Sequence, residues 1–155
     1  MKIQIKQARE LYSALVSITS GTHAAVTKLA NGDQTSTQVP YELDDKARWN
    51  LTKNLSLAEK IVKDADKARE GILRELTGGA GKDLKKSEDP EKFAQWLARV
   101  EALEEQVESA PFLRVKLTGL KVSNTNPVPG IVVAALRPIL EEDVPAPDAS
   151  EVIPD

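Results

Sequence analysis

The sequence predicts an α+β fold in which a long antiparallel helical hairpin packs beside a small, mostly antiparallel sheet. Apolar residues recur three and four positions apart across residues 45–76 and again across residues 90–108, which indicates two amphipathic helices. Apolar and polar residues instead alternate across residues 1–6 and 113–117, a pattern typical of half-buried strands. A short C-terminal helix and an extended acidic tail complete the expected fold.

The first forty residues combine a strand, a helix and a segment with two interpretations. We expect a strand over residues 2–6 and a helix over residues 7–19 that ends before Gly21. Asn31-Gly32 is a strong signal for a two-residue turn, because both positions of such a turn need a positive φ. The flanks are polar, so residues 24–39 form either an exposed β-hairpin or a mobile loop.

The clearest helix signal lies across residues 45–76. An aspartate before this segment can cap its N-terminus, and Gly78-Gly79 can end it. At 1.5 Å per residue the helix is about 50 Å long, which exceeds a small domain's diameter and favours self-association. A Gly- and Lys-rich loop over residues 77–88 then leads to the helix 90–108, which runs back along it.

The C-terminal third predicts a second strand and a short helix. The strand covers residues 112–122 with a bend at Gly119, and we expect it to pair with residues 2–6. The 26–39 hairpin would then extend this sheet. The helix covers residues 131–140 and is bent or ended near Pro138.

An acidic tail follows a basic body. Residues 141–155 carry six acidic residues, no basic residue and three prolines, which indicates a disordered or extended tail. The whole chain holds 21 basic and 24 acidic residues, so residues 1–140 hold 21 against 18 and carry a net charge of about +3. We therefore expect one domain over residues 1–140 and a separate tail over residues 141–155.

Composition excludes several classes of site. The chain has no cysteine and one histidine, which excludes disulfides, thiolate metal centres, iron–sulfur clusters, a cysteine nucleophile and a multi-histidine zinc site. We expect no cofactor and no metal. The longest apolar run, Ile131 to Leu136, is far shorter than the roughly 20 residues that span a membrane, and Met1 to Lys6 lacks the apolar run of a secretory signal.

Two local motifs resemble parts of enzyme active sites, but neither meets the requirements of one. Thr77 to Asp83 resembles a phosphate-binding loop, but Leu76 stands where its first glycine is needed, and Asp83 replaces the Ser or Thr that holds magnesium. His23 has no serine or aspartate partner at a defined spacing. We therefore expect a non-enzymatic protein, and an enzyme that acts through His23 is the weaker reading.

The candidate partner-binding surface lies on the helix 45–76. Five basic residues fall seven positions apart, and seven residues are two helical turns less about 20°, so these residues form one slowly drifting stripe opposite the apolar face. Trp49 falls within the stripe, and Lys63 lies beside it. We call the following set the basic ridge: Lys46, Trp49, Lys53, Lys60, Lys63, Lys67 and Arg74.

The basic ridge has three interpretations. It is a solvated helix face with surface pairs such as Glu59–Lys63 and Glu70–Arg74, a surface for a protein partner or, least favoured, a binding surface for nucleic-acid phosphates. An exposed indole is often an interface anchor, although Trp49 could equally fold back onto Tyr41 or Leu43.

The acidic tail is a second candidate for contact with the basic ridge. It could dock on the ridge of its own or of a neighbouring chain, because the two segments have opposite charge. A solubilising tail without a docking site is the alternative.

The order of these elements resembles a group of small uncharacterised proteins encoded among the structural and assembly genes of tailed bacteriophages. A strand runs into a helix over Met1 to Leu11, Pro40-Tyr41-Glu42-Leu43 follows a linker, and a charged helix starts over Lys46 to Leu55. The likeness covers most of residues 1–140, and the acidic tail departs from it. It contributes no active-site residue.

The resemblance implies a phage-type assembly or virion-associated adaptor that binds protein partners, among them phage structural proteins. Such a protein acts in the host cytoplasm during assembly or in the virion, and we expect it to form homo-oligomers. The alternative is a phage-encoded inhibitor of a host defence factor, which sequesters a protein or a small anionic ligand on Lys53, Lys60, Lys63 and Lys67.

Overall fold

A computed structural model describes residues 1–79 and 81–141, and within them the fold is α+β. Four α-helices pack with three small two-stranded sheets, two antiparallel and one parallel. All of the predicted acidic tail except Glu141 lies outside the described residues. In chain order the elements are β1 (Lys2–Gln4), α1 (Ile5–Ser20), β2 (Thr22–Lys28), β3 (Gln34–Pro40), α2 (Asp45–Thr77), α3 (Pro90–Glu104), β4 (Val107–Ser109), β5 (Val115–Lys116), a 3₁₀ turn (Leu117–Leu120), α4 (Gly130–Leu136), a second 3₁₀ turn (Arg137–Ile139) and β6 (Leu140–Glu141).

The core is small and lies around α1, which packs on both α2 and α4. Leu11 and Leu15 of α1, Leu51 of α2 and Leu136 of α4 are completely buried in it. The buried core cluster takes no residue from β2, β3 or α3, and its last residue on α2 is Ala58.

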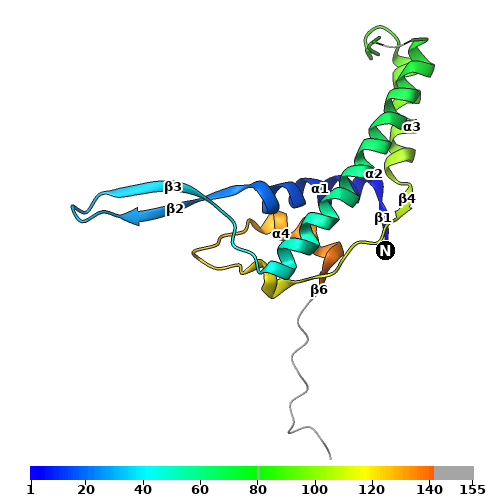
Figure 1. The fold of residues 1–155 in the computed structure, drawn as a ribbon. Coiled ribbons are helices and arrows are strands. Elements are labelled where there is room, and N and C mark those ends of the chain that lie inside the picture. The colour runs from blue at the N-terminus through cyan, green and yellow to red at the C-terminus, as the bar shows by residue number, and fades with distance from the viewer. Residues whose placement is uncertain (80, 142–155) are drawn as a thin grey trace, which may run out of the picture.

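Two arms project from this core in different directions (Figure 1). We call residues 22–40, which include β2 and β3, the β-arm. We call the described residues of 65–104, which include the C-terminal part of α2 and all of α3, the helical arm. Because most of both arms lies outside the core, hydrophobic burial does little to hold them in place. Their side chains are correspondingly available to other molecules.

The β-arm is the exposed hairpin that was one of the two interpretations of residues 24–39. Seven residue pairs join β2 to β3, from Thr22 opposite Pro40 to Lys28 opposite Gln34. Gly32 has a φ of 88°, but Asn31 has no positive φ, and residues 29–33 connect β2 to β3, so the connection is a longer loop than the predicted two-residue turn. The hairpin forms a sheet of its own, so the expectation that it extends the N-terminal sheet is wrong.

The N-terminal strand has a different partner from the one predicted. β1 pairs with β4, with Ile3 opposite Glu108, instead of with residues 112–122. Val107 completes the apolar stripe of the predicted helix 90–108, but α3 ends at Glu104 and Val107 belongs to β4. The helix 7–19 likewise begins earlier, at Ile5, because this buried residue satisfies both the strand alternation and the first apolar position of the helix.

The predicted strand 112–122 is mostly another structure. Only Val115–Lys116 is a strand, and the chain then turns into the 3₁₀ turn at Leu117–Leu120. The cause is a close approach to the N-terminus of α2: Gly119 accepts a hydrogen bond from the Asp44 N–H at 3.0 Å, and a Cβ at Gly119 would lie 2.9 Å from the Cβ of Ala47. Gly119 therefore allows this contact instead of bending a strand.

The helix predicted over residues 45–76 is one unbroken element, α2. The Asp44 carboxylate accepts a hydrogen bond from the Ala47 N–H at 2.7 Å and caps the helix, and Gly78 ends it with a φ of 77°. α3 packs against the C-terminal part of α2. There Arg69, which interrupts the apolar stripe of α2, lies over the Trp96 ring at 5.8 Å, so its cation has an aromatic partner on α3.

The C-terminal segment ends in a strand that the sequence pattern does not indicate. α4 stops at Leu136, and Pro138 lies in the 3₁₀ turn that follows, as expected near this proline. β6 then pairs in parallel with β5, with Lys116 opposite Glu141. The predicted helix 131–140 is therefore too long at its C-terminal end.

Asn54 connects the middle of α2 to the segment that leads into β5. Its side chain is completely buried; its Oδ1 accepts from the Leu113 N–H at 2.7 Å, and its Nδ2 donates to the Leu113 carbonyl at 2.8 Å. One turn earlier, Asn50 Nδ2 donates to the Arg114 carbonyl at 2.9 Å. Two asparagines on one helix face thus hold the backbone of two consecutive residues, Leu113 and Arg114, which have no strand partner at that point.

We predict that Asn54→Ala lowers the free energy of unfolding by about 2–4 kcal/mol, because it opens a cavity and leaves both Leu113 backbone groups without their partner. The matched variant Asn50→Ala removes a single, more exposed hydrogen bond and is expected to cost about 0.5–1.5 kcal/mol. Urea unfolding of the two variants measures the difference. Equal losses of unfolding free energy in the two variants would contradict the larger contribution to stability that we assign to Asn54.

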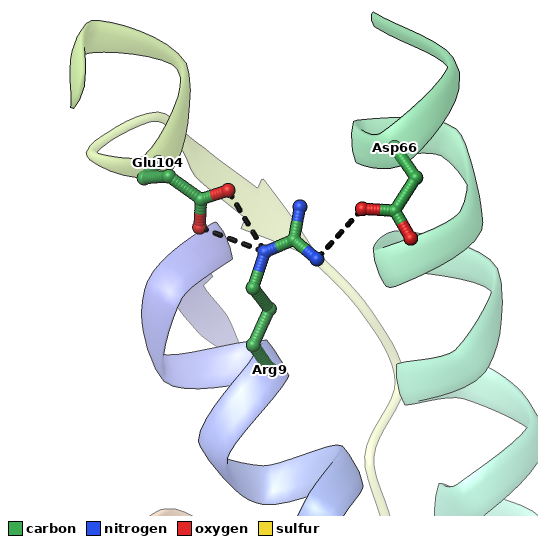
Figure 2. A network of polar contacts seen from close by, with 3 residues as sticks. All are labelled: Arg9, Asp66 and Glu104. Atoms are coloured by element: carbon green, nitrogen blue, oxygen red, sulfur yellow. Dashed lines mark hydrogen bonds and ion pairs between the residues drawn. The ribbon is translucent and has the colours of Figure 1, made fainter. Parts of the chain in front are cut away.

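Three elements meet at Arg9, which lies on α1 (Figure 2). Its Nε donates to the Glu104 carboxylate of α3 at 2.8 Å, and its Nη1 lies 2.7 Å from the Asp66 carboxylate of α2. Burial acts to lower the pKa of Arg9, but the hydrogen bonds to Asp66 and Glu104 outweigh it and raise the pKa above its ordinary value. The two ion pairs of the guanidinium therefore tie the base of the helical arm to the core.

Replacing Arg9 by methionine keeps the aliphatic side chain and removes this connection. We expect Arg9→Met to speed amide hydrogen exchange in α3 more than in α1, because Glu104 loses its partner and the arm opens locally. The control Arg99→Met breaks the Glu75–Arg99 pair, whose side chains are 66% and 45% exposed, and should change exchange little. Equal exchange rates in the two variants would show that Arg9 does not hold the arm.

Candidate functional site

The basic ridge lies along α2 with every member exposed to solvent. The helix is continuous from Asp45 to Thr77, so the seven-residue spacing of the cations is kept along its whole length. Bases seven residues apart are separated by about 10.5 Å along the axis. The opposite face of the first half of the helix carries Ala47, Leu51 and Ala58, which are buried in the core. The ridge therefore stands on a helix whose first half is anchored.

Trp49 is the most unusual residue of the basic ridge. Its side chain is 62% exposed, and it does not join Tyr41 and Leu43 in the core. The Lys53 ammonium lies 4.8 Å from the centre of the indole ring, at a distance typical of a cation–π contact. A rigid, largely exposed indole next to a cation offers both apolar area and charge to a partner.

Ion pairs partly neutralise the middle of the basic ridge. Lys63 Nζ lies 2.9 Å from the Glu59 carboxylate, and this hydrogen bond raises the pKa of Lys63. Lys60 Nζ lies 3.3 Å from Asp64. The predicted pair Glu59–Lys63 is therefore confirmed, whereas Arg74 makes no ion pair with Glu70 or any other acid among residues 1–79 and 81–141. Within the same part of the chain, Lys46 and Lys67 also have no acidic partner.

His23 lies on β2, where the hairpin meets the core. Its ring packs against that of Tyr41 with 5.2 Å between ring centres. Its Nδ1 is buried and has no hydrogen-bond partner among the described residues. The neighbourhood of His23 is thus an aromatic contact at the base of the β-arm.

The described residues contain no group of three or more His, Asp or Glu side chains that could hold a metal ion. Within the same ranges, no helix is both long and apolar enough to span a membrane. The loop that resembles a phosphate-binding motif follows α2, and the Thr77 hydroxyl donates to the Leu73 carbonyl at 2.8 Å.

A second exposed surface lies between α1 and α4. The groove there has a volume of about 670 Å³ and is lined mainly by small or apolar residues, among them Ala14, Ser17 and Ala135. Ile131 stands at this groove and is 81% exposed. The groove differs from the basic ridge in having no excess of positive charge, because its charged lining residues are Arg9 and Glu10. The sequence pattern indicates the groove only through the apolar run that begins at Ile131.

Sequence reasoning missed the polar residues that connect the elements. Asn54 has a usable signal, because it occupies an apolar position between Leu51 and Ala58. Asn126 has none: it is buried in a loop, where it accepts from the Glu42 N–H at 2.9 Å and donates to the Glu42 and Leu120 carbonyls.

Comparisons of the chain with protein-family models, with curated proteins and with solved structures gave no match.

Proposed function

We propose that this chain is a non-enzymatic adaptor of the phage type, which binds protein partners through the basic ridge. The observation that carries the proposal is the exposed indole of Trp49, packed beside the Lys53 ammonium on an anchored helix. Indoles and cations of this kind dominate the binding energy of many protein interfaces. The first half of α2 is held by the core, so ordering this surface on binding costs little conformational entropy.

The two projecting arms support the same proposal. The strands of the β-arm and helix α3 of the helical arm contribute no residue to the buried core cluster, and α3 has no fully buried residue. Such arms enlarge the surface that a small chain can present to several partners. Phage structural proteins are the partners that we propose, in the host cytoplasm during assembly or in the virion.

The alternative is an inhibitor that sequesters a protein or a small anionic ligand. It draws less support from the geometry, because Lys60 and Lys63 already lie beside Asp64 and Glu59. An anionic ligand would have to displace these carboxylates to use the middle of the basic ridge.

Neighbouring genes supply the candidate partners for a direct test. We expect them to encode capsid, portal or tail proteins, one of which should be retained by the tagged chain on co-expression. Trp49→Ala should weaken the complex about 30-fold, as for an interface residue worth about 2 kcal/mol. Isothermal titration calorimetry with the purified pair measures the change.

The control for this experiment is Val26→Ala, which truncates a side chain on the β-arm that is 64% exposed and so resembles Trp49 in exposure. It should leave affinity unchanged. Trp49→Ala should also cost no more than about 1 kcal/mol in stability, because the indole lies outside the core and its cation contact is exposed. A loss of binding in Val26→Ala alone would move the interface to the β-arm and overturn the proposal.

We also propose that copies of the chain associate through the helical arm. α3 leaves Leu97 49% exposed and has no fully buried residue, so its apolar stripe stays only partly covered within one chain. Light scattering should give a mass that is a multiple of 16.9 kDa, and Leu97→Glu should reduce it to that of the single chain. A mass of 16.9 kDa for the unsubstituted chain at high concentration would contradict self-association.

A further inference from the structure

The described chain ends beside the first cation of the basic ridge. Glu141 belongs to β6 and lies opposite Lys116 of β5. The same residue lines a small cavity at the N-terminus of α2 together with Lys46 and Arg114. Residues 142–155 therefore leave the described part of the chain at one end of the ridge.

Residues 142–155 have the opposite charge to the basic ridge, with no basic residue among them. Asp148, Glu151 and Asp155 are three and four positions apart, which in an extended chain corresponds to steps of about 10–13 Å. The cations of the ridge are seven residues apart on a helix, which corresponds to steps of about 10.5 Å. The spacing of these three acids along an extended segment therefore matches the spacing of three successive cations. A polyproline II conformation, with three residues per turn, keeps Asp148 and Glu151 on the same side, whereas a β-strand would point them to opposite sides.

The direction and length of the segment are also compatible with this arrangement. Residues 113–119 run toward the N-terminus of α2, because Leu113 is hydrogen-bonded to Asn54 and Gly119 to Asp44. β5 lies in this segment, and β6 is parallel to β5, so β6 runs in the same direction. The segment must therefore turn once before it can run back along the helix, and Pro145 and Pro147 are typical turn residues. The remaining residues 148–155 extend over about 26 Å, which is enough for the roughly 21 Å from Lys53 to Lys67.

We propose that residues 142–155 bind the basic ridge of their own chain, with Asp148, Glu151 and Asp155 opposite Lys53, Lys60 and Lys67. Exposed ion pairs are individually weak, but the covalent link keeps the acids at an effective concentration on the order of millimolar. The contact is therefore populated at low salt and released at high salt. At Lys60 the tail competes with Asp64, which lies 3.3 Å away.

This contact has a regulatory consequence that rests on the proposed function. The same segment passes Trp49 and Lys53, so it covers the surface that the adaptor offers to its partner. A bound tail then acts as an internal competitor, and a partner binds only by displacing it. The two ideas are separable, because tail docking can be observed without any partner.

A nitroxide at one tail position tests the contact in the full chain. The protein has no cysteine, so Ser150→Cys provides a single labelling site. At low salt we expect the label to cause loss of the NMR amide signals of residues 53–67, with much smaller losses in the β-arm. The signals should return in 1 M salt, where the screening length is about 3 Å. Losses spread evenly over both arms, or no losses, would overturn the proposal.

Two sets of charge variants make this test specific. Neutralising the tail with Asp148→Asn, Glu151→Gln and Asp155→Asn should abolish the signal loss, as should Lys53→Gln, Lys60→Gln and Lys67→Gln on the ridge. The matched control replaces three exposed lysines elsewhere, Lys2, Lys6 and Lys28, by glutamine and should leave the loss unchanged. An effect of the control equal to that of the ridge variant would show a non-specific charge effect and overturn the proposal.

Mixing labelled and unlabelled chains distinguishes contact within one chain from contact between copies. An isotope-enriched chain without the nitroxide should keep its α2 signals when a labelled, unenriched chain is added. Signal loss in that mixture would place the tail on a neighbouring copy and overturn the intramolecular proposal. If docking is confirmed, the tail-neutral variant should bind the partner more tightly than the original chain; unchanged affinity would overturn only the regulatory consequence.

Discussion

The arrangement of the C-terminal third depends on the pair of hydrogen bonds between Asn54 and the Leu113 backbone. A peptide group that leaves water needs a partner of its own, and at Leu113 no strand supplies one. The buried amide of Asn54 satisfies both the N–H and the carbonyl, and so holds residues 113–116 against α2. β5 is positioned by this contact, β6 pairs with β5, and the exit of the chain at Glu141 follows from that pairing.

A small core with two arms is the second constraint on the molecule. The buried cluster ends at Ala58 on α2, so the half of the helix that carries Lys67 and Arg74 has little burial to hold it. Polar contacts take over this role, because Arg9 joins α1 to Asp66 and Glu104, and Arg69 faces Trp96. The anchored half of α2 can therefore present a rigid surface at Trp49, while the helical arm can open locally without loss of the core.

Local chemistry predicts those elements that depend on near neighbours in the chain. Short patterns predict the span of α2, the aspartate that caps it, the glycine that ends it and the positive φ of Gly32, although the loop around Gly32 is longer than the two-residue turn that the pattern predicts. The exposure of the cations also follows, because the apolar stripe defines the face that must be buried. The alternation at residues 113–117 predicted more strand than the structure contains: only Val115–Lys116 is a strand, and of the three alternating apolar residues only Val115 is buried, because alternation cannot tell how far a partner strand extends.

The sequence by itself determined that this protein has a long amphipathic helix with a cationic stripe, a hairpin turn near Gly32 and an acidic C-terminal segment. Only the tertiary structure decided that β1 pairs with β4, that β6 exists, and that Asn54 and Arg9 connect distant elements. The physical reason is the separation along the chain of the residues that interact. Helix and turn preferences arise within a few residues. Strand pairing and buried hydrogen bonds instead depend on which segments compete for the same backbone groups, and Lys2 and Ser109, which pair, are 107 residues apart in the chain.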